Sequence, residues 1–427
     1  MVQQGESMYE LLKKIFPYCR SITGEGVRQT LADIQEYVGG VISNKEIASG
    51  TQVYDWTVPK EWNIEDAYIE NENGERIIDF RDNNLHVMGY SYPIDKWVSR
   101  DELMDYVYVQ EDQPDVIPYV TSYYKERSGF CMTKNQRDSL PEGRYHMVID
   151  SRLFDGVLNY GEVILPGESS QEILITSYTC HPSMGNNECS GPVVWAELLK
   201  YTLNIPRRRY TYRFVLHPET IGSIAYISRN IDTLKSRVQA GFVLSCVGDD
   251  RAYSIVHSRY GSTLADKVLD NLISKKDTYC SYSYLQRGSD ERQYNAPGVD
   301  LPVVAFCRSK YGEYPEYHTS KDDLTLVSAE GLYGAYSVMK NVINVLENNR
   351  KYRVKVLCEP QLGKRNLYPT ISKKGSYADI RTLTNFIAYA DGTCDMLSIA
   401  DRIGVSADKL IPIADKLLKE ELIEIVD

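Results

Sequence analysis

The sequence has no stretch of 18 consecutive apolar residues and no Cys-x-x-Cys pair. The first absence predicts that no helix spans a membrane, because a spanning helix needs about 20 mostly apolar residues. The second removes the usual signal of a zinc ribbon. Nine cysteines are scattered from Cys19 to Cys394, an odd number that predicts reduced thiols in a cytoplasmic protein. The opening segment MVQQGESMYELLKKIF also lacks the charged and then apolar architecture of a signal peptide.

Basic residues are outnumbered: 48 Lys and Arg face 59 Asp and Glu, which gives a net charge of −11. This balance argues against nucleic acid as a partner, because phosphate binding needs a basic surface. It argues equally against an anionic membrane surface. We therefore expect the partner to be a small-molecule or peptide substrate.

The chain of 427 residues is long enough for two or three domains, and the pattern of apolar and polar residues changes along its length. Between residues 161 and 350, apolar strand-like runs alternate with helical patterns. This alternation predicts an α/β domain, a mostly parallel mixed sheet sandwiched by helices, formed by residues 1–50 and 161–355. Residues 51–160 show short alternating runs broken by turn residues and predict an inserted β-rich domain. Its core is expected to contain Trp56, Trp62 and Trp97.

Residues 370–427 read as short helices followed by a strand, which is the arrangement of a winged helix. From Asp379 to Asp427 there are ten acidic and five basic residues, a net charge of −5. A protein that reads DNA normally presents a basic face. We therefore expect this segment to be a packing module or the surface of a homo-oligomer.

Only six histidines are present, and two of them stand where chemistry is expected. His181 follows the apolar run EILITSYT, and His318 lies in a loop, YGEYPEYHTSKDDL, before a long helical run. Acidic residues accompany them: Glu188 is seven positions after His181, Glu219 ends RFVLHPE, and Asp249 lies near the end of VLSCVGDD. Ligands bind at the carboxyl ends of strands in open α/β sheets, so these groups are predicted to converge there.

Mixed histidine and carboxylate ligands suit zinc, which activates water and polarises a carbonyl when a coordination position stays open. A nearby free carboxylate can take the proton of that water. Other interpretations remain open. A histidine after a strand can be a hydrogen-bonded loop residue, and acidic residues at strand ends can cap the next helix. Cys180 and Cys189 are expected to pack rather than to bind metal, and a cysteine nucleophile paired with His181 would lack an orienting signature.

Five motifs carry a resemblance to a known family, in the order CHPSMGNNECSGP, HPETIGS, VGDD, RGSDERQYNAPGVDLPV and EYHTSKDDL. They resemble the zinc-dependent aminopeptidases that use two co-catalytic metal ions. The chain is still more similar to a bacterial family with an aminopeptidase-like domain, an inserted protease-associated-type β-domain and a C-terminal winged helix. Proteins of that family are often linked to surface-polysaccharide biosynthesis. The resemblance covers nearly the whole chain.

The resemblance implies roles for particular residues. His181 and His318 match the two metal-binding histidines, and Glu219 matches a position that is either a metal ligand or the general base. Asp249 lies near the position of a later metal-binding aspartate, although Ser245 can also occupy that position. Asp290, in GSDERQY, matches a motif that is structural or orients the substrate.

Two departures from the peptidase pattern change the expected site. Asn187 stands where a carboxylate would bridge two metal ions, and an amide binds zinc poorly. Pro218 replaces the first residue of a Glu pair that ends at Glu219. We therefore expect one zinc ion rather than two, held by the two histidines with Glu188 or Glu219. If Glu219 is a ligand, the base is expected to be Glu188 or Glu316.

The predicted function is hydrolysis of an amide bond in a small peptide or in an aminoacyl or acylamino-sugar substrate by metal-activated water. The alternative is a catalytically inactive binding or scaffold protein that retains the fold, which Asn187 and Pro218 favour.

Overall fold

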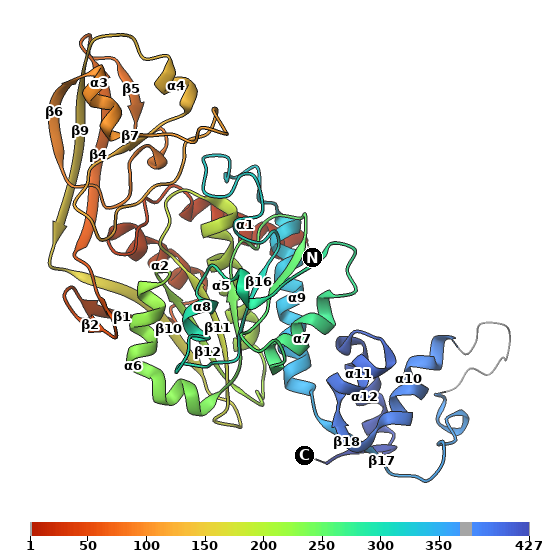
Figure 1. The fold of residues 1–427 in the computed structure, drawn as a ribbon. Helices are drawn as coiled ribbons and strands as arrows, with labels where there is room; N and C mark the ends of the chain where they lie inside the picture. Colours follow the sequence, from red (N-terminus) through yellow and green to blue (C-terminus); the bar gives the residue numbers. More distant parts are fainter. Residues whose placement is uncertain (1, 368–377, 427) are drawn as a thin grey trace.

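Eight strands form the central sheet of the computed structural model, which describes residues 2–367 and 378–426. In their order across the sheet they are β1 (Ser43–Ala48), β10 (Val157–Leu165), β12 (Thr211–His217), β11 (Glu172–Tyr178), β13 (Val238–Leu244), β16 (Val303–Cys307), β14 (Tyr253–Val256) and β15 (Tyr279–Tyr282). The four central strands β12, β11, β13 and β16 run parallel. β10 is antiparallel to β1 and β12, and β14 is antiparallel to β16. This mixed, mostly parallel sheet confirms the predicted α/β class (Figure 1).

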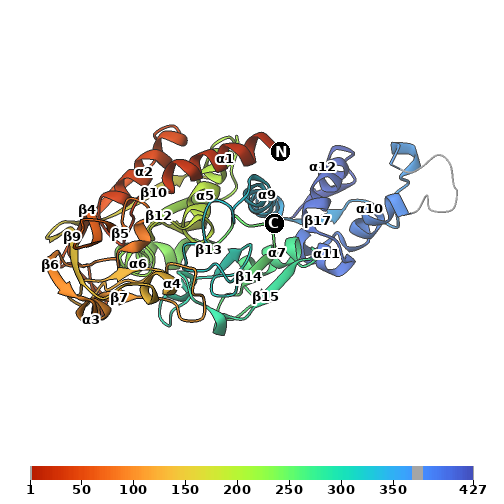
Figure 2. The ribbon, with the colours of Figure 1, turned by 90° about the horizontal axis from the view of Figure 1, so that it is seen from above.

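Helices cover both faces of the sheet, because its central strands are apolar on both sides. On β11, Ile173 and Ile175 pack into one hydrophobic cluster and Leu174 packs into another. The first cluster includes α1 (Val2–Ile15), α2 (Glu25–Tyr37), α5 (Ser190–Leu203), α7 (Leu264–Ile273) and α9 (Ala329–Asn348). The second includes α6 (Ile221–Arg237) and α8 (Glu291–Tyr294). Figure 2 shows the two layers from above. β14 and β15 are short strands of mixed polarity, which the apolar runs of the sequence do not reveal.

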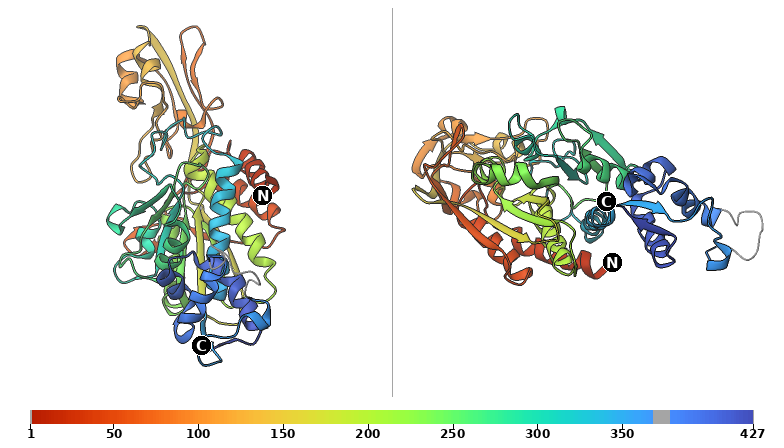
Figure 3. Two further views of the ribbon diagram at one scale, coloured as in Figure 1. Left: turned by 90° about the vertical axis from the view of Figure 1, so that its right-hand side faces the viewer. Right: turned by 90° about the horizontal axis from the view of Figure 1, so that it is seen from below.

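The insert is built on a long antiparallel ribbon of β4 (Glu61–Asn71) and β9 (Arg144–Phe154), flanked by β5 (Arg76–Asp79) and β6 (Ile94–Ser99). Smaller elements complete it: β2 (Gln52–Val53), β3 (Trp56–Thr57), β7 (Val107–Tyr108), β8 (Phe130–Cys131), α3 (Arg100–Leu103) and α4 (Lys134–Asp138). It projects from the sheet domain, as the left view of Figure 3 shows. Trp62 is buried as expected. Trp56 and Trp97 are not core residues, because their exposed fractions are 37% and 42%.

The C-terminal unit contains a small sheet of β17 (Lys351–Val354), β18 (Asp391–Asp395) and β19 (Ile423–Ile425) with helices α10 (Ala378–Tyr389), α11 (Met396–Ile403) and α12 (Ile411–Lys419). The predicted helices and final strand are present. The expected start at residue 370 lies outside the described residues, and β17 joins this sheet from before that point. The expected end of the inserted domain is residue 160. β10 begins before that residue, and it belongs to the central sheet.

The insert reaches back to the sheet domain through the segment around Tyr119. The Tyr119 N–H donates to the carbonyl of His318 at 2.9 Å, and the Ser320 N–H donates to the carbonyl of Ile117 at 2.9 Å. These two bonds flank a bridge between Pro118 and Thr319, so the insert fixes the loop that carries His318. None of the helices formed by the described residues has both the length and the apolar content needed to cross a bilayer.

Candidate active site

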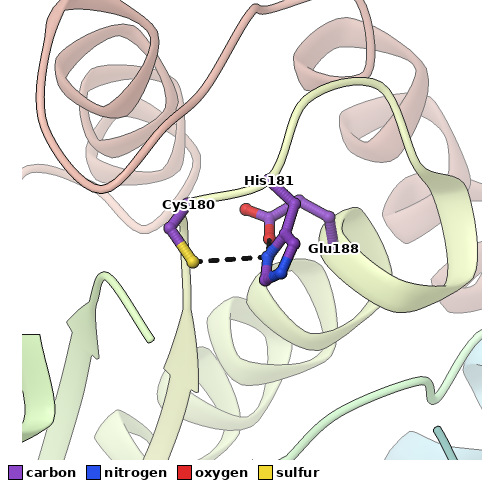
Figure 4. Close-up of side chains that lie close together, drawn as sticks. All are labelled: Cys180, His181 and Glu188. Carbon is purple, nitrogen blue, oxygen red and sulfur yellow. Dashed lines mark hydrogen bonds and ion pairs between the residues drawn. The ribbon is translucent and has the colours of Figure 1, made fainter. Parts of the chain in front are cut away.

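The loop after β11 carries the first group of polar side chains. Cys180 and His181 follow the strand directly, and a π-helical turn over Gly185–Cys189 brings Glu188 back beneath them before α5 begins. The His181 Nδ1 atom lies 3.0 Å from Oε2 of Glu188 and 3.3 Å from Sγ of Cys180 (Figure 4). All three residues are buried. The π turn therefore supplies a carboxylate that fixes the orientation of the His181 ring.

A buried arginine on the far side of Glu188 was not anticipated from the sequence. The Nε atom of Arg20 lies 3.2 Å from Oε1 of Glu188 and donates to the His181 carbonyl at 2.9 Å. The side chains of Arg20 and Glu188 are 0% and 1% exposed. Burial raises the pKa of Glu188 to about 8, although the Arg20 charge acts in the opposite direction. Burial, and then Arg20, lower the pKa of His181 to about 3.

Glu219 comes to the same place from the end of β12. Its Oε2 atom lies 3.8 Å from Nε2 of His181, and the Ser289 hydroxyl donates to Oε1 at 2.6 Å. Burial, and then the charge of Asp290, raise the pKa of Glu219 to about 8. The next residue, Thr220, has a left-handed backbone with φ of 63°, and its N–H donates to Oδ1 of Asp290 at 2.8 Å. Asp290 thus holds the turn that aims Glu219 at His181.

His318 faces His181 from the loop that the insert fixes. The two ring centroids are 5.5 Å apart, and the Tyr119 ring lies 5.2 Å from His181 and 5.0 Å from His318. The His318 backbone is left-handed, with φ of 57°. Its Nε2 atom is buried and has no hydrogen-bond partner in the described part of the chain. Burial, and then His181, lower the pKa of His318 to about 3. A neutral imidazole with a free nitrogen is the form that binds metal.

These groups line a cavity of about 290 Å³ between the sheet domain and the insert. Its wall contains Ile22, Trp56, Tyr119, Thr121, Tyr123, Tyr124, Cys180, His181, Glu219, Thr220, Ile221, Arg292 and His318. Glu219 is the one carboxylate in this wall, because Glu188 lies behind His181. A larger hollow of about 680 Å³, between the N-terminal helices and the insert, includes neither histidine.

Asp249 lies apart from this group. Its Oδ1 accepts hydrogen bonds from the Ser309 hydroxyl and the Arg251 N–H, both at 2.9 Å. Its Oδ2 accepts from the Asn186 amide and the Ser309 N–H, also at 2.9 Å. No oxygen of Asp249 is left for an ion, and the residue does not line the cavity. The sequence correctly places it at a strand end, but the structure does not bring it to His181.

Two further predicted residues have other partners. Glu316, a candidate base, pairs with Arg251 at 2.9 Å on the surface, and this pair lowers its pKa. Asn187 accepts a hydrogen bond from the Tyr178 hydroxyl at 3.3 Å, while its buried Nδ2 has no partner within the described residues.

The donor atoms can be tested against a metal ion. In the described ranges, Cys180, His181 and Glu188 form the one set of three potential ligands whose atoms lie within 4.8 Å of one another. Glu188, however, is already neutralised by Arg20 and bonded to Nδ1 of His181. A carboxylate in that position orients a metal-binding histidine and leaves its Nε2 as the ligand atom. The Nε2 of His181 faces Glu219, and His318 has a free buried Nε2. The residues therefore fit one cation on the cavity side of His181.

Known proteins resemble the chain over its whole length. The family described as a domain of unknown function, DUF4910, matches residues 9–349, and a winged helix-turn-helix family matches residues 350–425. A Clostridium acetobutylicum protein, provisionally named as a polysaccharide biosynthesis protein with aminopeptidase-like domain, is 43% identical over 99% of this chain and 97% of its own length. A crystal structure provisionally described as a peptidase of the same organism has a TM-score of 0.92 at 41% identity, and covers 100% of this chain and 97% of that one.

More distant structures share the fold alone. A zinc aminopeptidase from Bacillus subtilis has a TM-score of 0.58 at 13% identity, covering 79% of this chain and 94% of its own. A peptidase M28 precursor from Shewanella amazonensis also has a TM-score of 0.58, at 11% identity, covering 84% and 96%. The sheet domain described above therefore has the fold of these peptidases.

Proposed function

Because the chain belongs to the DUF4910 family and has an aminopeptidase-like fold with a C-terminal winged helix, we propose that it is a zinc-dependent hydrolase. Its substrate would contain an amide bond, in a small peptide or in an aminoacyl or acylamino-sugar compound. The observation that carries the proposal is the meeting of His181, Glu219 and His318 at one cavity, with a buried free nitrogen on His318. The provisional name of the Clostridium relative supports a sugar-linked substrate.

One zinc ion would be held by Nε2 of His181 and by His318. When bound, it would lower the pKa of a water molecule and polarise the scissile carbonyl. Asn187 and Arg20 argue against a second ion. An amide supplies no charge to neutralise another dication, and the guanidinium of Arg20 already balances Glu188.

The remaining polar residues have distinct roles in this proposal. Glu219 takes the proton of the attacking water, because it is the one carboxylate in the cavity wall and a raised pKa favours proton transfer near neutral pH. Ser289 holds one of its oxygens and leaves the other free. Glu188 orients His181 and is not itself a ligand. Asp249 supports the loop that precedes α5 through Asn186 and takes no part in the chemistry.

Bound zinc and turnover test the proposal. The protein is purified without a metal-chelating tag, and zinc is measured in wild type, His318→Ala and Glu219→Gln, followed by hydrolysis of aminoacyl anilides. We expect about one zinc per chain in wild type, little in His318→Ala, and retained zinc without turnover in Glu219→Gln. Loss of zinc in Glu219→Gln would make this residue the third ligand instead. No zinc in wild type, before or after addition above pH 7, would refute the hydrolase.

A second candidate is a binding or scaffold protein that keeps the fold without catalysis. The observation in its favour is that the cavity wall contains one carboxylate, whereas the peptidase pattern has several. Asn187 and Pro218 stand at two positions where that pattern has a carboxylate. Zinc binding without turnover of any aminoacyl or acylamino-sugar amide would favour this candidate.

We propose a reducing, cytoplasmic setting for the reaction, which the nine free cysteines support. We propose that the acidic C-terminal unit serves packing or homo-oligomer formation rather than contact with nucleic acid. We also propose three domains, with the insert ending before β10 and the C-terminal unit beginning near β17.

A further inference from the structure

Arg292, in the first turn of α8, is a cation in the cavity wall with few partners of its own. Its Nη2 donates to the Thr220 hydroxyl at 2.6 Å. Its Nε is buried and has no hydrogen-bond partner, and no ion pair joins Arg292 to a carboxylate in the described ranges. The Arg292 charge partly opposes the rise in the pKa of Glu219 that burial and Asp290 cause. An arginine that lines a cavity and has no carboxylate partner is suited to bind an oxyanion, because a guanidinium can present paired donors to two oxygens.

Two aromatic rings from the insert form the rim of the same cavity. The ring centroids of Trp56 and Tyr124 are 5.6 Å apart, and the rings pack in a T-shaped arrangement with an angle of 64° between their planes. Their exposed fractions of 37% and 56% are high for such large side chains. Tyr119 and Tyr123 line the interior and bond to each other through their hydroxyls at 2.6 Å. Exposed aromatic faces at a cavity mouth are suited to stack on a flat or apolar ring.

We infer that this cavity selects a substrate with a ring and an anionic group, the ring against Trp56 and Tyr124 and the anion on Arg292. The inference rests on the proposed hydrolase, because it assigns the substrate class of the same site. The volume of about 290 Å³ accommodates a molecule of roughly one ring with a short side chain. An oxyanion on Arg292 would lie close to Thr220 and so beside Glu219. The anion would therefore position the scissile amide at the two histidines.

The test measures binding rather than turnover. Isothermal titration compares hippurate, which has a ring, an amide and a carboxylate, with its neutral amide and with phenyl phosphate. The protein is used both after chelator treatment and with zinc, because a carboxylate can also bind the metal. The variants are Arg292→Gln and Arg292→Lys, with Arg287→Gln as the matched control. Arg287 is an exposed arginine of the same segment, and it donates to the Tyr284 carbonyl at 3.3 Å.

In chelator-treated wild type we expect hippurate to bind about tenfold more tightly than its amide. Arg292→Gln should remove this preference, Arg292→Lys should keep part of it, and Arg287→Gln should keep it all. Tighter binding of phenyl phosphate, lost in Arg292→Gln, would identify the anion as a phosphate. A near-ultraviolet circular dichroism spectrum matching wild type checks that each variant is folded.

Equal affinities of wild type and Arg292→Gln for hippurate would overturn the inference. A carboxylate preference that needs zinc and ignores Arg292 would also overturn it, while leaving the zinc site intact. A preference that survives in chelator-treated His318→Ala protein would support the inference even if the hydrolase proposal failed. If Arg292→Gln does not fold, the Arg292→Lys affinity and the comparison of hippurate with its amide still decide the matter.

Discussion

Two buried polar clusters lie at the carboxyl ends of neighbouring strands, and they differ in how many of their polar atoms have hydrogen-bond partners. Around Asp249, after β13, both carboxylate oxygens accept two hydrogen bonds each. Around His181, after β11, buried atoms without hydrogen-bond partners gather in the described residues: Nδ2 of Asn187, Oε1 of Glu188, Nε of Arg292 and Nε2 of His318. Native proteins leave few such atoms, so the second cluster is arranged for something other than stability.

The difference separates a structural carboxylate from candidate functional groups, although the sequence places both at strand ends. Oε1 of Glu188 still has the nearby charge of Arg20 at 3.2 Å, so charge balance holds there even where hydrogen bonding is incomplete. The predictions below test whether one cluster supports the fold and the other serves a ligand.

Replacing Arg20 with Met should have the largest effect on stability. The change removes the cationic partner of the buried Glu188 carboxyl group, and breaking a buried pair by removing one partner typically costs about 3–5 kcal/mol. It also removes the donor to the His181 carbonyl. Urea unfolding followed by both fluorescence and circular dichroism gives the free energy of unfolding.

The matched control for Arg20 is Arg353→Met, which breaks an exposed ion pair with Glu424. Such a pair contributes about 0–1 kcal/mol. An equal loss of unfolding free energy in the two variants would mean that the buried pair contributes no more to stability than the exposed pair.

Asp249→Ala should lower the free energy of unfolding by about 2–3 kcal/mol, because the donors of Ser309, Arg251 and Asn186 lose a charged acceptor. Its zinc content should equal that of wild type. His318→Ala should behave in the opposite way, with zinc lost and stability changed less. Urea unfolding and metal analysis of the two variants give this comparison directly. Zinc loss in Asp249→Ala at unchanged stability would instead return Asp249 to the metal site that the family resemblance implies.

The sequence predicts the scaffold of this site better than its partners. β11 and β13 are runs of apolar residues, so strand type, burial and the carboxyl-end position of His181 and Asp249 follow from local pattern. The difference in hydrogen bonding between the two clusters depends on side chains that are distant in the sequence. Arg20 lies 161 residues before His181, and Tyr119 comes from the insert. Nothing in the local sequence around either residue indicates that it will be buried against His181.

Prediction from local sequence reaches the same limit in the inserted domain. Aromatic residues in alternating runs are usually core, which correctly describes Trp62. Trp56 lies on a two-residue strand whose tight pairing with β2 leaves its ring exposed at the cavity. That outcome depends on how the insert packs on the sheet domain, which the alternation of residues does not encode.

Asn187→Asp would replace an amide whose buried Nδ2 has no partner in the described residues with the carboxylate of the peptidase pattern. Without zinc, the new charge would lie near Asp322, which accepts from the Asn187 N–H at 3.0 Å. We expect a loss of about 1–3 kcal/mol from this buried, poorly paired charge. Excess zinc should restore stability, because a ligand that binds only the folded state stabilises it. Thermal unfolding with and without zinc, and the zinc stoichiometry, measure both effects. An equal loss in both conditions would show that position 187 does not face an ion.

The smallest effect is expected at a histidine that is fully satisfied, in contrast to His318. His146 in the insert bonds to Glu70 at 2.8 Å and to Asp95 at 2.7 Å, and it stacks on Trp97. The hydrogen bond to Glu70, and then that to Asp95, raise the pKa of His146 above its usual value of 6.5. A raised pKa means that the folded state binds the proton more tightly than the unfolded state. The stabilisation from this proton is therefore complete below about pH 6.5 and disappears as the pH rises through the folded pKa.

His146→Gln should lower the free energy of unfolding by less than about 1 kcal/mol at pH 6, since the site is near the surface. The difference in stability between this variant and wild type should shrink by pH 9. Thermal unfolding across this range measures the difference, and a gap that grows with pH would contradict the charge assignment.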